Sequence, residues 1–328
     1  MASSKTRHGI PAYLVNGKAA QGDTADEVLG NAGLDFKIGK ENLFTEGGKQ
    51  LDKRFMRTFR EDTDQTFGVV GHGYEVIQNA DVLAISDKFV ENKDMTWDRI
   101  GVRKHGADIW GSFKLNEGFS IKGFDDIDQY VYLCNSNDGN GALKIVPANI
   151  RPMCTNQYAH WAGTLKAAGI NLRDLTIRHS SKMSEKIDKL GNALEIVDHL
   201  NENFVLQAEE MMELELSIPE REEFYISHLG LKTDSKLKAK DNKHGLKTRG
   251  MNALNAVFEV EGHRNNTVNG IGGTAWGTYN TLTQYLDHNW ILNGSGDVKA
   301  SAADSAIFGT AGRMKAKAFD DLVARTIV

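Results

Sequence analysis

Short alternating runs of apolar and polar residues dominate the chain from Phe36 to Ile150. Gly, Asn and Asp interrupt these runs, a pattern typical of β-strands joined by tight turns. One longer segment, 80–91, repeats its apolar residues at helical spacing and follows Asn79, a favourable N-cap residue. The pattern therefore predicts antiparallel strands and one helix in this half. The predicted strands are 36–44, 54–59, 67–70, 74–77, 97–104, 107–115, 129–135 and 142–150.

Turn sequences predict two hairpins in this half. The segment 104–107 separates the strands on either side of it, and Asn137-Asp-Gly-Asn-Gly141 separates 129–135 from 142–150. Asp-Gly and Asn-Gly pairs adopt positive φ at little energetic expense, so they favour a tight turn between antiparallel strands.

The periodicity changes to helical after Ile150. Apolar residues recur at three- and four-residue steps from Ser184 to Glu215, which predicts one long helix of about four heptads. Further helices are predicted at 155–168, 219–229, 248–259, 274–290 and 314–327, with a short strand at 175–178. The predicted class is α+β: an antiparallel β-rich N-terminal half, a long helix and a helical C-terminal half. We divide the chain into a surface arm (1–35, with a helix at 24–32), an α+β domain (36–182) and a helical region (183–328).

Composition narrows the class of protein. The 328 residues carry 39 Lys and Arg against 44 Asp and Glu, and no apolar run approaches the ~18 residues of a membrane span. The charged N-terminus is not followed by an apolar signal segment. Cys134 and Cys154 alone build neither a disulfide framework nor a four-cysteine zinc site. We expect a cytoplasmic protein with no membrane contact, metal or cofactor.

The segment 230–250 concentrates positive charge. Its seven cations oppose only Asp234 and Asp241, a net charge of +5 that leaves −10 on the rest of the chain. A lysine-rich loop of this kind neutralises several phosphates and binds nucleic acid in a salt-sensitive way. A solvated linker between helices would show the same pattern. The candidate phosphate contacts are Lys232, Lys236, Lys238, Lys240, Lys243, Lys247 and Arg249, together with Arg151 outside the segment.

Aromatic residues within 274–290 provide a second candidate feature. Trp276 and Tyr279 would stack on the bases of a single strand if their rings lie beside a basic groove. Their helical spacing is equally consistent with ordinary core packing.

Evidence for catalysis is weaker. Asp125, Asp126 and Asp128 cluster before a predicted strand, as nuclease carboxylates do, but the acidic-x-Lys partner of such sites does not follow. The histidines show no metal-ligand spacing, and no nucleophile elbow occurs. We therefore assign no catalytic residue.

Three ordered motifs resemble the phage/plasmid-like protein family, a domain of unknown function found in phages, plasmids and their bacterial hosts. They are Tyr132-Leu-Cys-Asn-Ser-Asn-Asp-Gly139, Arg151-Pro-Met-Cys-Thr-Asn156 and Ile177-Arg-His-Ser180, and the segment 276–288 is similar to the family's closing helix. The matching positions whose role is open are Asn135, Asp138, Gly139, Asn156 and His179. Asn137 stands where the family usually has His, which favours a hairpin turn over a catalytic base at this position. The resemblance implies a role in a mobile element, and the parts are loosely similar to those of phage single-strand annealing proteins.

These observations lead to one functional hypothesis and two alternatives. We expect a homo-oligomeric phage or plasmid protein that binds single-stranded DNA and promotes strand annealing or recombination. The first alternative is an interaction or assembly protein of a phage, which would use the acidic remainder and the long helix as contact surfaces. The second is a metal-dependent nuclease that uses the three aspartates at 125–128.

Overall fold

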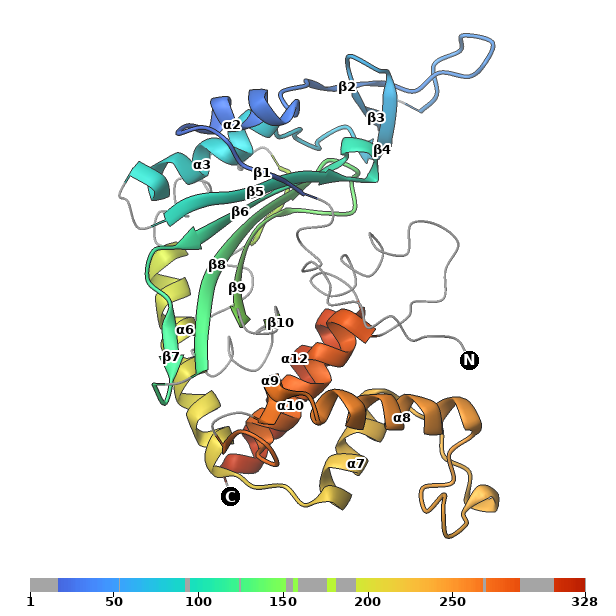
Figure 1. Cartoon of the computed structure of the whole chain (residues 1–328). Coiled ribbons are helices and arrows are strands. Elements are labelled where there is room, and N and C mark those ends of the chain that lie inside the picture. The colour runs from blue at the N-terminus through green and yellow to red at the C-terminus, as the bar shows by residue number, and fades with distance from the viewer. Residues whose placement is uncertain are drawn as a thin grey trace.

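The residues that the structure describes form an eight-stranded antiparallel sheet in the N-terminal half (Figure 1). This computed structural model describes residues 17–52, 54–91, 95–123, 125–151, 156–158, 176–180, 193–267, 270–289 and 310–327. The strand order is β1-β5-β6-β8-β9-β10, with β7 paired to β8 and β11 paired to β9. The strands are β1 (Gly17–Ala19), β5 (Met95–Arg103), β6 (Asp108–Leu115), β7 (Phe119–Ile121), β8 (Asp125–Ser136), β9 (Leu143–Arg151), β10 (Asn156–Tyr158) and β11 (Thr176–Ile177).

A second, three-stranded antiparallel sheet lies beside one end of the first. Its strands are β2 (Ile38–Asn42), β3 (Phe55–Arg60) and β4 (Gln65–Gly71), in that order. A register shift between Thr58 and Phe59 interrupts the β3–β4 ladder. The chain between β2 and β3 projects from the body of the molecule (Figure 1).

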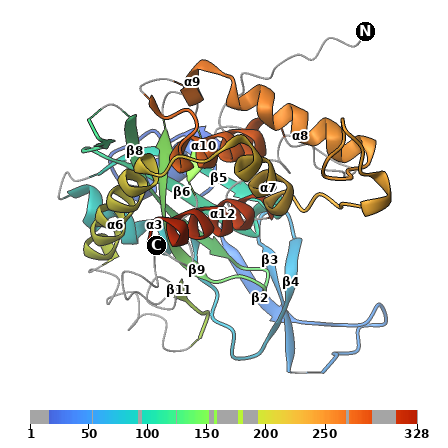
Figure 2. The ribbon, with the colours of Figure 1, turned by 90° about the horizontal axis from the view of Figure 1, so that it is seen from below.

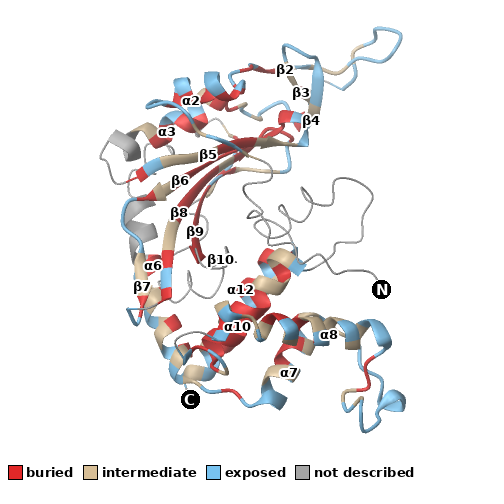
Figure 3. Cartoon of the chain, viewed as in Figure 1, coloured by how far each residue is buried: buried red, intermediate tan, exposed pale blue. Residues whose placement is uncertain are grey.

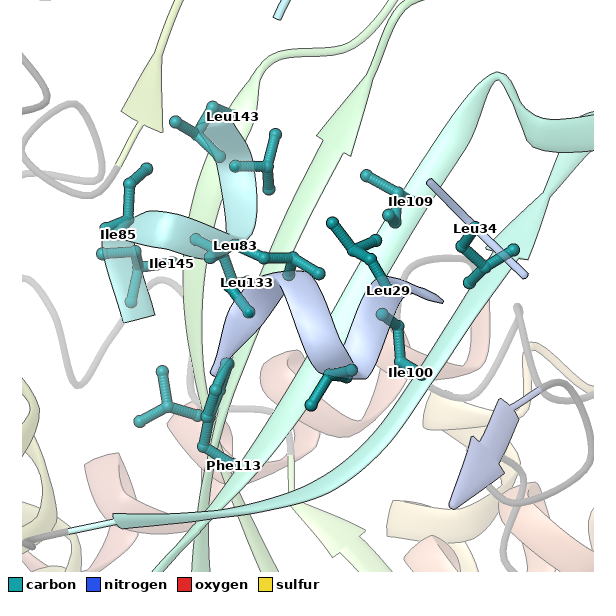
Figure 4. Close-up of a cluster of buried hydrophobic side chains, with 14 of the residues drawn as sticks. Leu29, Leu34, Leu83, Ile85, Ile100, Ile109, Phe113, Leu133, Leu143 and Ile145 are labelled. Atoms are coloured by element: carbon teal, nitrogen blue, oxygen red, sulfur yellow. The ribbon is translucent and has the colours of Figure 1, made fainter. Parts of the chain in front are cut away.

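Helices α2 (Ala25–Ala32) and α3 (Asn79–Glu91) cover one face of the large sheet. Thr24 caps α2 because its hydroxyl accepts a hydrogen bond from the Glu27 amide at 3.3 Å. The covering helices and the sheet enclose a core of aliphatic side chains, in which Leu29, Leu83 and Ile100 are at most 1% exposed (Figure 4).

The C-terminal half is helical and forms around a central helix, α10 (Ala275–Gln284). This helix contacts α6 (Ala193–Glu213), α8 (Thr248–Glu261) and α12 (Thr310–Thr326), and it continues as a π-helical turn over Tyr285–Asn289 (Figure 2). Helices α7 (Ile218–His228) and α9 (Arg264–Thr267) complete the described helices. Ile121 of β7 and Ile127 of β8 belong to the same core as the helices, so the two halves share packing.

The predicted α+β class is confirmed, and most predicted elements lie within a few residues of the observed ones. The predicted hairpins are confirmed because β6 pairs with β5 and β9 pairs with β8, both antiparallel. The described part of the predicted long helix is α6. The part of that prediction from 184 to 192 lies outside the described residues.

Three predictions need correction or fall partly outside the described residues. Residues 17–35 do not form a surface arm, because β1 pairs with β5 and Val28 and Leu29 of α2 are buried in the core. Residues 156–158 form strand β10 and not a helix; the rest of the predicted 155–168 helix lies outside the described residues. The predicted strand 74–77 is absent.

Side chains from distant segments explain why 74–77 is not a strand. Lys40 Nζ donates to the Tyr74 carbonyl at 2.6 Å, and His179 Nδ1 lies 2.7 Å from the Glu75 carbonyl. The Asn137 side-chain amide bonds to both the carbonyl and the N–H of Ile77. These contacts satisfy backbone groups that would otherwise need a neighbouring strand.

Among the described helices, none combines the length and the apolar character that crossing a bilayer requires.

Candidate functional site

The basic loop, defined here as residues 230–250, connects α7 to α8 and includes the first residues of α8. It extends from the ends of these helices, away from the large sheet (Figure 1), and most of its length is exposed (Figure 3). All seven of its lysine and arginine residues are exposed. The sequence predicted the charge of this segment, and the structure adds that the charges face solvent.

Hydrogen bonds within the basic loop fix its backbone. Thr233 and Leu246 form an isolated β-bridge, and the Asp234 amide donates to the Gly245 carbonyl at 2.8 Å. Gly245 has φ +66°, and a Cβ at this position would lie 2.1 Å from the Asp234 carbonyl oxygen. Only glycine therefore fits this closure. Leu246 is 2% exposed and belongs to the helical core, so it anchors the loop.

Asn242 braces the tip of the basic loop. Its Nδ2 donates to the Leu237 carbonyl at 3.2 Å and to the Leu246 carbonyl at 2.8 Å. Its Oδ1 accepts from the Leu246 amide at 2.8 Å. In the first part of the loop, the Asp234 carboxylate accepts a local hydrogen bond from the Lys236 amide at 2.9 Å. The lysines between these contacts are therefore presented on a defined backbone.

One carboxylate outside the loop binds it. Glu222 of α7 forms an ion pair with Lys243, and its Oε2 lies 3.0 Å from His244 Nε2. Partial burial alone would raise the pKa of Glu222, but the hydrogen bonds from Lys243 and His244 outweigh it and lower the pKa. Within the described residues, the other six cations of the loop form no ion pair.

The other three residues considered for nucleic-acid contact are buried. Trp276, Tyr279 and Arg151 are each 0% exposed. Asp125 holds two of them, since its Oδ1 lies 2.5 Å from Arg151 Nε and its Oδ2 accepts from Trp276 Nε1 at 2.8 Å. None of the three offers a surface to a base or a phosphate here, and the core-packing interpretation of the two aromatic residues applies.

The family motif around Asn135–Gly139 forms the turn between β8 and β9. Its Asn137 is 1% exposed and bonds to Ile77 as described above, and its carbonyl accepts from Thr58 Oγ1 at 2.6 Å. Gly68 of β4 lies against this turn so closely that a Cβ would be 2.2 Å from the Asp138 carbonyl oxygen. The turn therefore joins the large sheet to the small sheet.

A charged network surrounds the motif turn. Ser136 Oγ lies 2.6 Å from Asp108 Oδ1 and 2.8 Å from Asp138 Oδ1, and Lys104 Nζ lies 2.7 Å from Asp138 Oδ2. Burial alone would raise the pKa of Asp138, but Lys104, the Asn140 amide and Ser136 lower it to about 2. Lys104 itself has φ +47°, an unusual conformation for a residue with a side chain. In the sequence, Lys104 ends a predicted strand and begins a predicted turn, and no local pattern indicates this network.

His179 joins the same network from the segment that follows β11, far along the chain. Its ring stacks on Tyr74 with centroids 4.5 Å apart and an interplanar angle of 7°. Burial lowers the pKa of His179 against the opposing effects of the Glu75 carbonyl, Asp138 and the Ser136 backbone. The structure thus brings together His179, Asp138 and Gly139, three of the motif positions whose role was open.

The remaining motif positions lie elsewhere in the sheet. Asn135 is 2% exposed within β8, opposite Ile109. Asn156 pairs with Arg151 between β10 and β9. Residues 152–155 of the second motif lie outside the described residues.

The three aspartates of the nuclease alternative do not converge. Asp125 is buried with Arg151 and Trp276, Asp126 is exposed, and Asp128 pairs with Lys114 at 2.8 Å. In the described part of the chain, no three histidine, cysteine or acidic residues form a group suited to a metal ion. Burial raises the pKa of the Cys134 thiol to about 12, so this cysteine is a poor nucleophile.

A comparison with family models matches residues 66–309 to DUF932, described as a domain of unknown function. This range covers most of the chain, including the motif turn, the basic loop and α10. No curated protein and no solved structure matches the chain.

Proposed function

We propose that this chain, which belongs to the DUF932 family of domains of unknown function, is a DNA-binding protein. In this proposal the basic loop binds single-stranded DNA through its phosphates, and the protein acts in the DNA metabolism of a phage or plasmid. The observation that carries it is the set of six exposed cations that have no carboxylate partner in the described part of the chain, presented on a loop with an internally bonded backbone.

The chemistry of these cations favours phosphate contact over base recognition. Six of the loop's seven cations are lysines, whose ammonium groups act as point charges and lack the planar fork of arginine. Contacts of this kind position a protein on a strand and carry no sequence information. The surrounding acidic remainder, at −10, repels phosphates from other surfaces and directs a strand to the loop.

Binding through phosphates is also compatible with strand annealing. Trp276 and Tyr279 are buried, so they do not stack on bases in this proposal. A strand held by its backbone keeps its base edges free to pair with a complementary strand. We therefore propose annealing or recombination as the process in which the loop acts.

A salt titration with matched variants tests the proposal. The loop variant replaces Lys232, Lys236, Lys238 and Lys240 with Gln. The control variant replaces four exposed lysines outside the loop with Gln: Lys37, Lys49, Lys144 and Lys317. Both variants lose the same net charge, so a difference between them reports the location of the DNA and not the total charge.

Fluorescence anisotropy with a labelled single-stranded oligonucleotide supplies the readout. At ~0.7 counterions released per phosphate of single-stranded DNA, losing four contacts reduces the slope of log K against log salt by about 3. We expect this change in the loop variant and a much smaller one in the control. Equal slopes in the two variants would exclude the loop as the binding site.

A second candidate function is protein interaction, favoured by a separate observation. The eight exposed large hydrophobic residues of the described chain include Phe44, Leu51, Phe55 and Val69, which all lie on the small sheet or its projecting connection. Exposed apolar side chains that gather on one region mark contact surfaces. For this second candidate function, we propose that the partner is another copy of this chain, bound through this region.

A further inference from the structure

The basic loop is attached to the helical half by two different kinds of contact. Leu246 is buried in the core at the end of the loop. Nearer the tip, Lys243 and His244 both contact Oε2 of Glu222 on α7. The side chains of Glu222 and His244 are only 16% and 20% exposed, so their contact is better shielded from water than an ordinary surface ion pair, whereas Lys243 is 55% exposed.

We propose that Glu222 is a positioning residue that holds the basic loop in its DNA-binding orientation, with Lys243 and His244 as tether residues. This inference rests on the proposed DNA-binding function. It separates the cations of the loop into two groups. Lys243 holds the loop, whereas Lys232, Lys236, Lys238, Lys240, Lys247 and Arg249 are free to contact phosphates.

The physical reason is preorganisation. A loop that is already ordered loses less conformational entropy when DNA binds, so more of the interaction energy appears as affinity. Asn242 and the Thr233–Leu246 bridge order the loop internally but do not set its angle to α7. Leu246 fixes one end of the loop in the helical core, and the Glu222 contact adds a second constraint nearer the tip.

The tether and simple electrostatics predict opposite changes in DNA affinity when Glu222 is removed. Removing an acidic residue near a DNA-binding loop should strengthen binding if only charge matters. If Glu222 positions the loop, Glu222→Ala should weaken binding although it removes a negative charge and releases Lys243. Glu223 is the matched control, since it is the next residue of α7 and is exposed with no ion pair among the described residues.

Two measurements distinguish this inference from the proposed function. Anisotropy with single-stranded DNA should show binding about two- to fivefold weaker for Glu222→Ala, the range expected for losing a partly shielded ion pair. Glu223→Ala should bind as tightly as the wild type or slightly more tightly. Limited trypsin digestion without DNA should show faster cleavage after Lys236, Lys238 and Lys240 in Glu222→Ala alone.

A charge exchange provides the rescue. The double variant Glu222→Lys with Lys243→Glu keeps the net charge and restores the ion pair but not the contact with His244, so we expect trypsin protection and DNA affinity to lie between those of Glu222→Ala and the wild type. Equal trypsin sensitivity of Glu222→Ala and Glu223→Ala would overturn the tether. If the wild type binds no DNA, the proposed function fails, and the trypsin comparison still decides whether Glu222 holds the loop.

Discussion

A single glycine controls how closely the two sheets approach. Gly68 of β4 faces the carbonyl of Asp138 in the motif turn, and a Cβ there would lie 2.2 Å from that oxygen. Backbone on both sides leaves no flexible side chain to move away. The absence of a side chain at Gly68 therefore allows β4 to contact the turn that carries Asn137 and Asp138.

Alanine substitutions in β4 test this contact. We expect Gly68→Ala to lower the free energy of unfolding by about 1–3 kcal/mol, the usual range for overpacking a tight site. Gly71→Ala in the same strand is the control, because a Cβ there meets nothing within 4 Å. Its effect should be near zero or slightly stabilising, since alanine restricts the unfolded chain. Urea unfolding measures both, and equal effects would contradict the close approach.

At the scale of elements, the segment that follows β11 is held to the chain before α3 by one histidine. His179 stacks on Tyr74 and bonds to the Glu75 carbonyl, while Asp138 of the β8–β9 turn forms an ion pair with Lys104 of the β5–β6 turn. Burial lowers the pKa of His179, so the folded state favours the neutral ring. The unfolded chain binds a proton more readily, near the ordinary histidine value of about 6.5.

This difference predicts acid sensitivity. The stability contributed by neutral His179 is present above about pH 6.5, where neither state is protonated, and is lost as the pH falls through the lowered pKa of the folded state. Asp138 does not interfere, because its pKa of about 2 lies well below this window. We expect His179→Gln to reduce the loss of stability between pH 7 and pH 5. Urea unfolding at both pH values provides the measurement, with His228→Gln as a comparison at another buried histidine whose pKa burial also lowers.

An unchanged pH dependence in His179→Gln would show that this ring does not couple β11 to proton binding. If only His228→Gln reduces the pH dependence of stability, the acid sensitivity arises instead from the contact between His228 of α7 and Asp321 of α12.

The elements also show what the sequence could predict. Alternation predicted strands such as β6 and β9, and the structure buries side chains on both faces of each, in two separate hydrophobic clusters. Pro219 and the capping box of Ser217 and Glu220 agree with the predicted start of α7. The same alternation failed at 74–77, where the backbone partners are side chains of Lys40, Asn137 and His179. No local pattern records contacts with residues so far away in the chain.

The candidate site divides in the same way. Charge alone located the basic loop, because exposed lysines need no partner to be recognised in a sequence. The aromatic spacing of Trp276 and Tyr279 fits both a stacking surface and a core, and burial by distant elements decided between them. The pairing of Arg151 with Asp125 and the tether from Glu222 to Lys243 likewise depend on tertiary structure.

At the scale of the whole molecule, the basic loop and the exposed hydrophobic residues of the small sheet occupy different regions, although Leu237, which is 40% exposed, lies on the loop itself. The basic loop extends from the helical half, whereas the exposed hydrophobic residues Phe55 and Val69 lie on the small sheet beside the other half (Figures 1 and 3). Phe55 and Val69 are close to each other on that sheet, because Phe55 is opposite Gly71 and Arg57, two residues further along β3, is opposite Val69. In the proposed function, this arrangement places the DNA-binding loop and the candidate contact surface in different parts of the molecule.

We expect the small sheet to mediate self-association of this chain. Phe55 and Val69 are 48% and 56% exposed, and their burial against a second copy would stabilise an oligomer through the hydrophobic effect. Phe55→Ser combined with Val69→Thr should therefore yield a monomer where the wild type associates. Leu206→Ser is the control, because Leu206 of α6 is 60% exposed but lies outside this region.

Sedimentation equilibrium over a range of protein concentrations distinguishes the outcomes, because mass action makes the average mass of an associating protein rise with concentration. A rising mass for the wild type and Leu206→Ser, with a constant monomer mass for the double variant, would assign association to the small sheet. A monomeric wild type would remove this candidate. Repeating the DNA titration with the double variant then separates the roles of the two regions. If the basic loop binds DNA by itself, the slope of log K against log salt per monomer stays the same. The apparent affinity for DNA falls, because associated copies no longer bind one strand together.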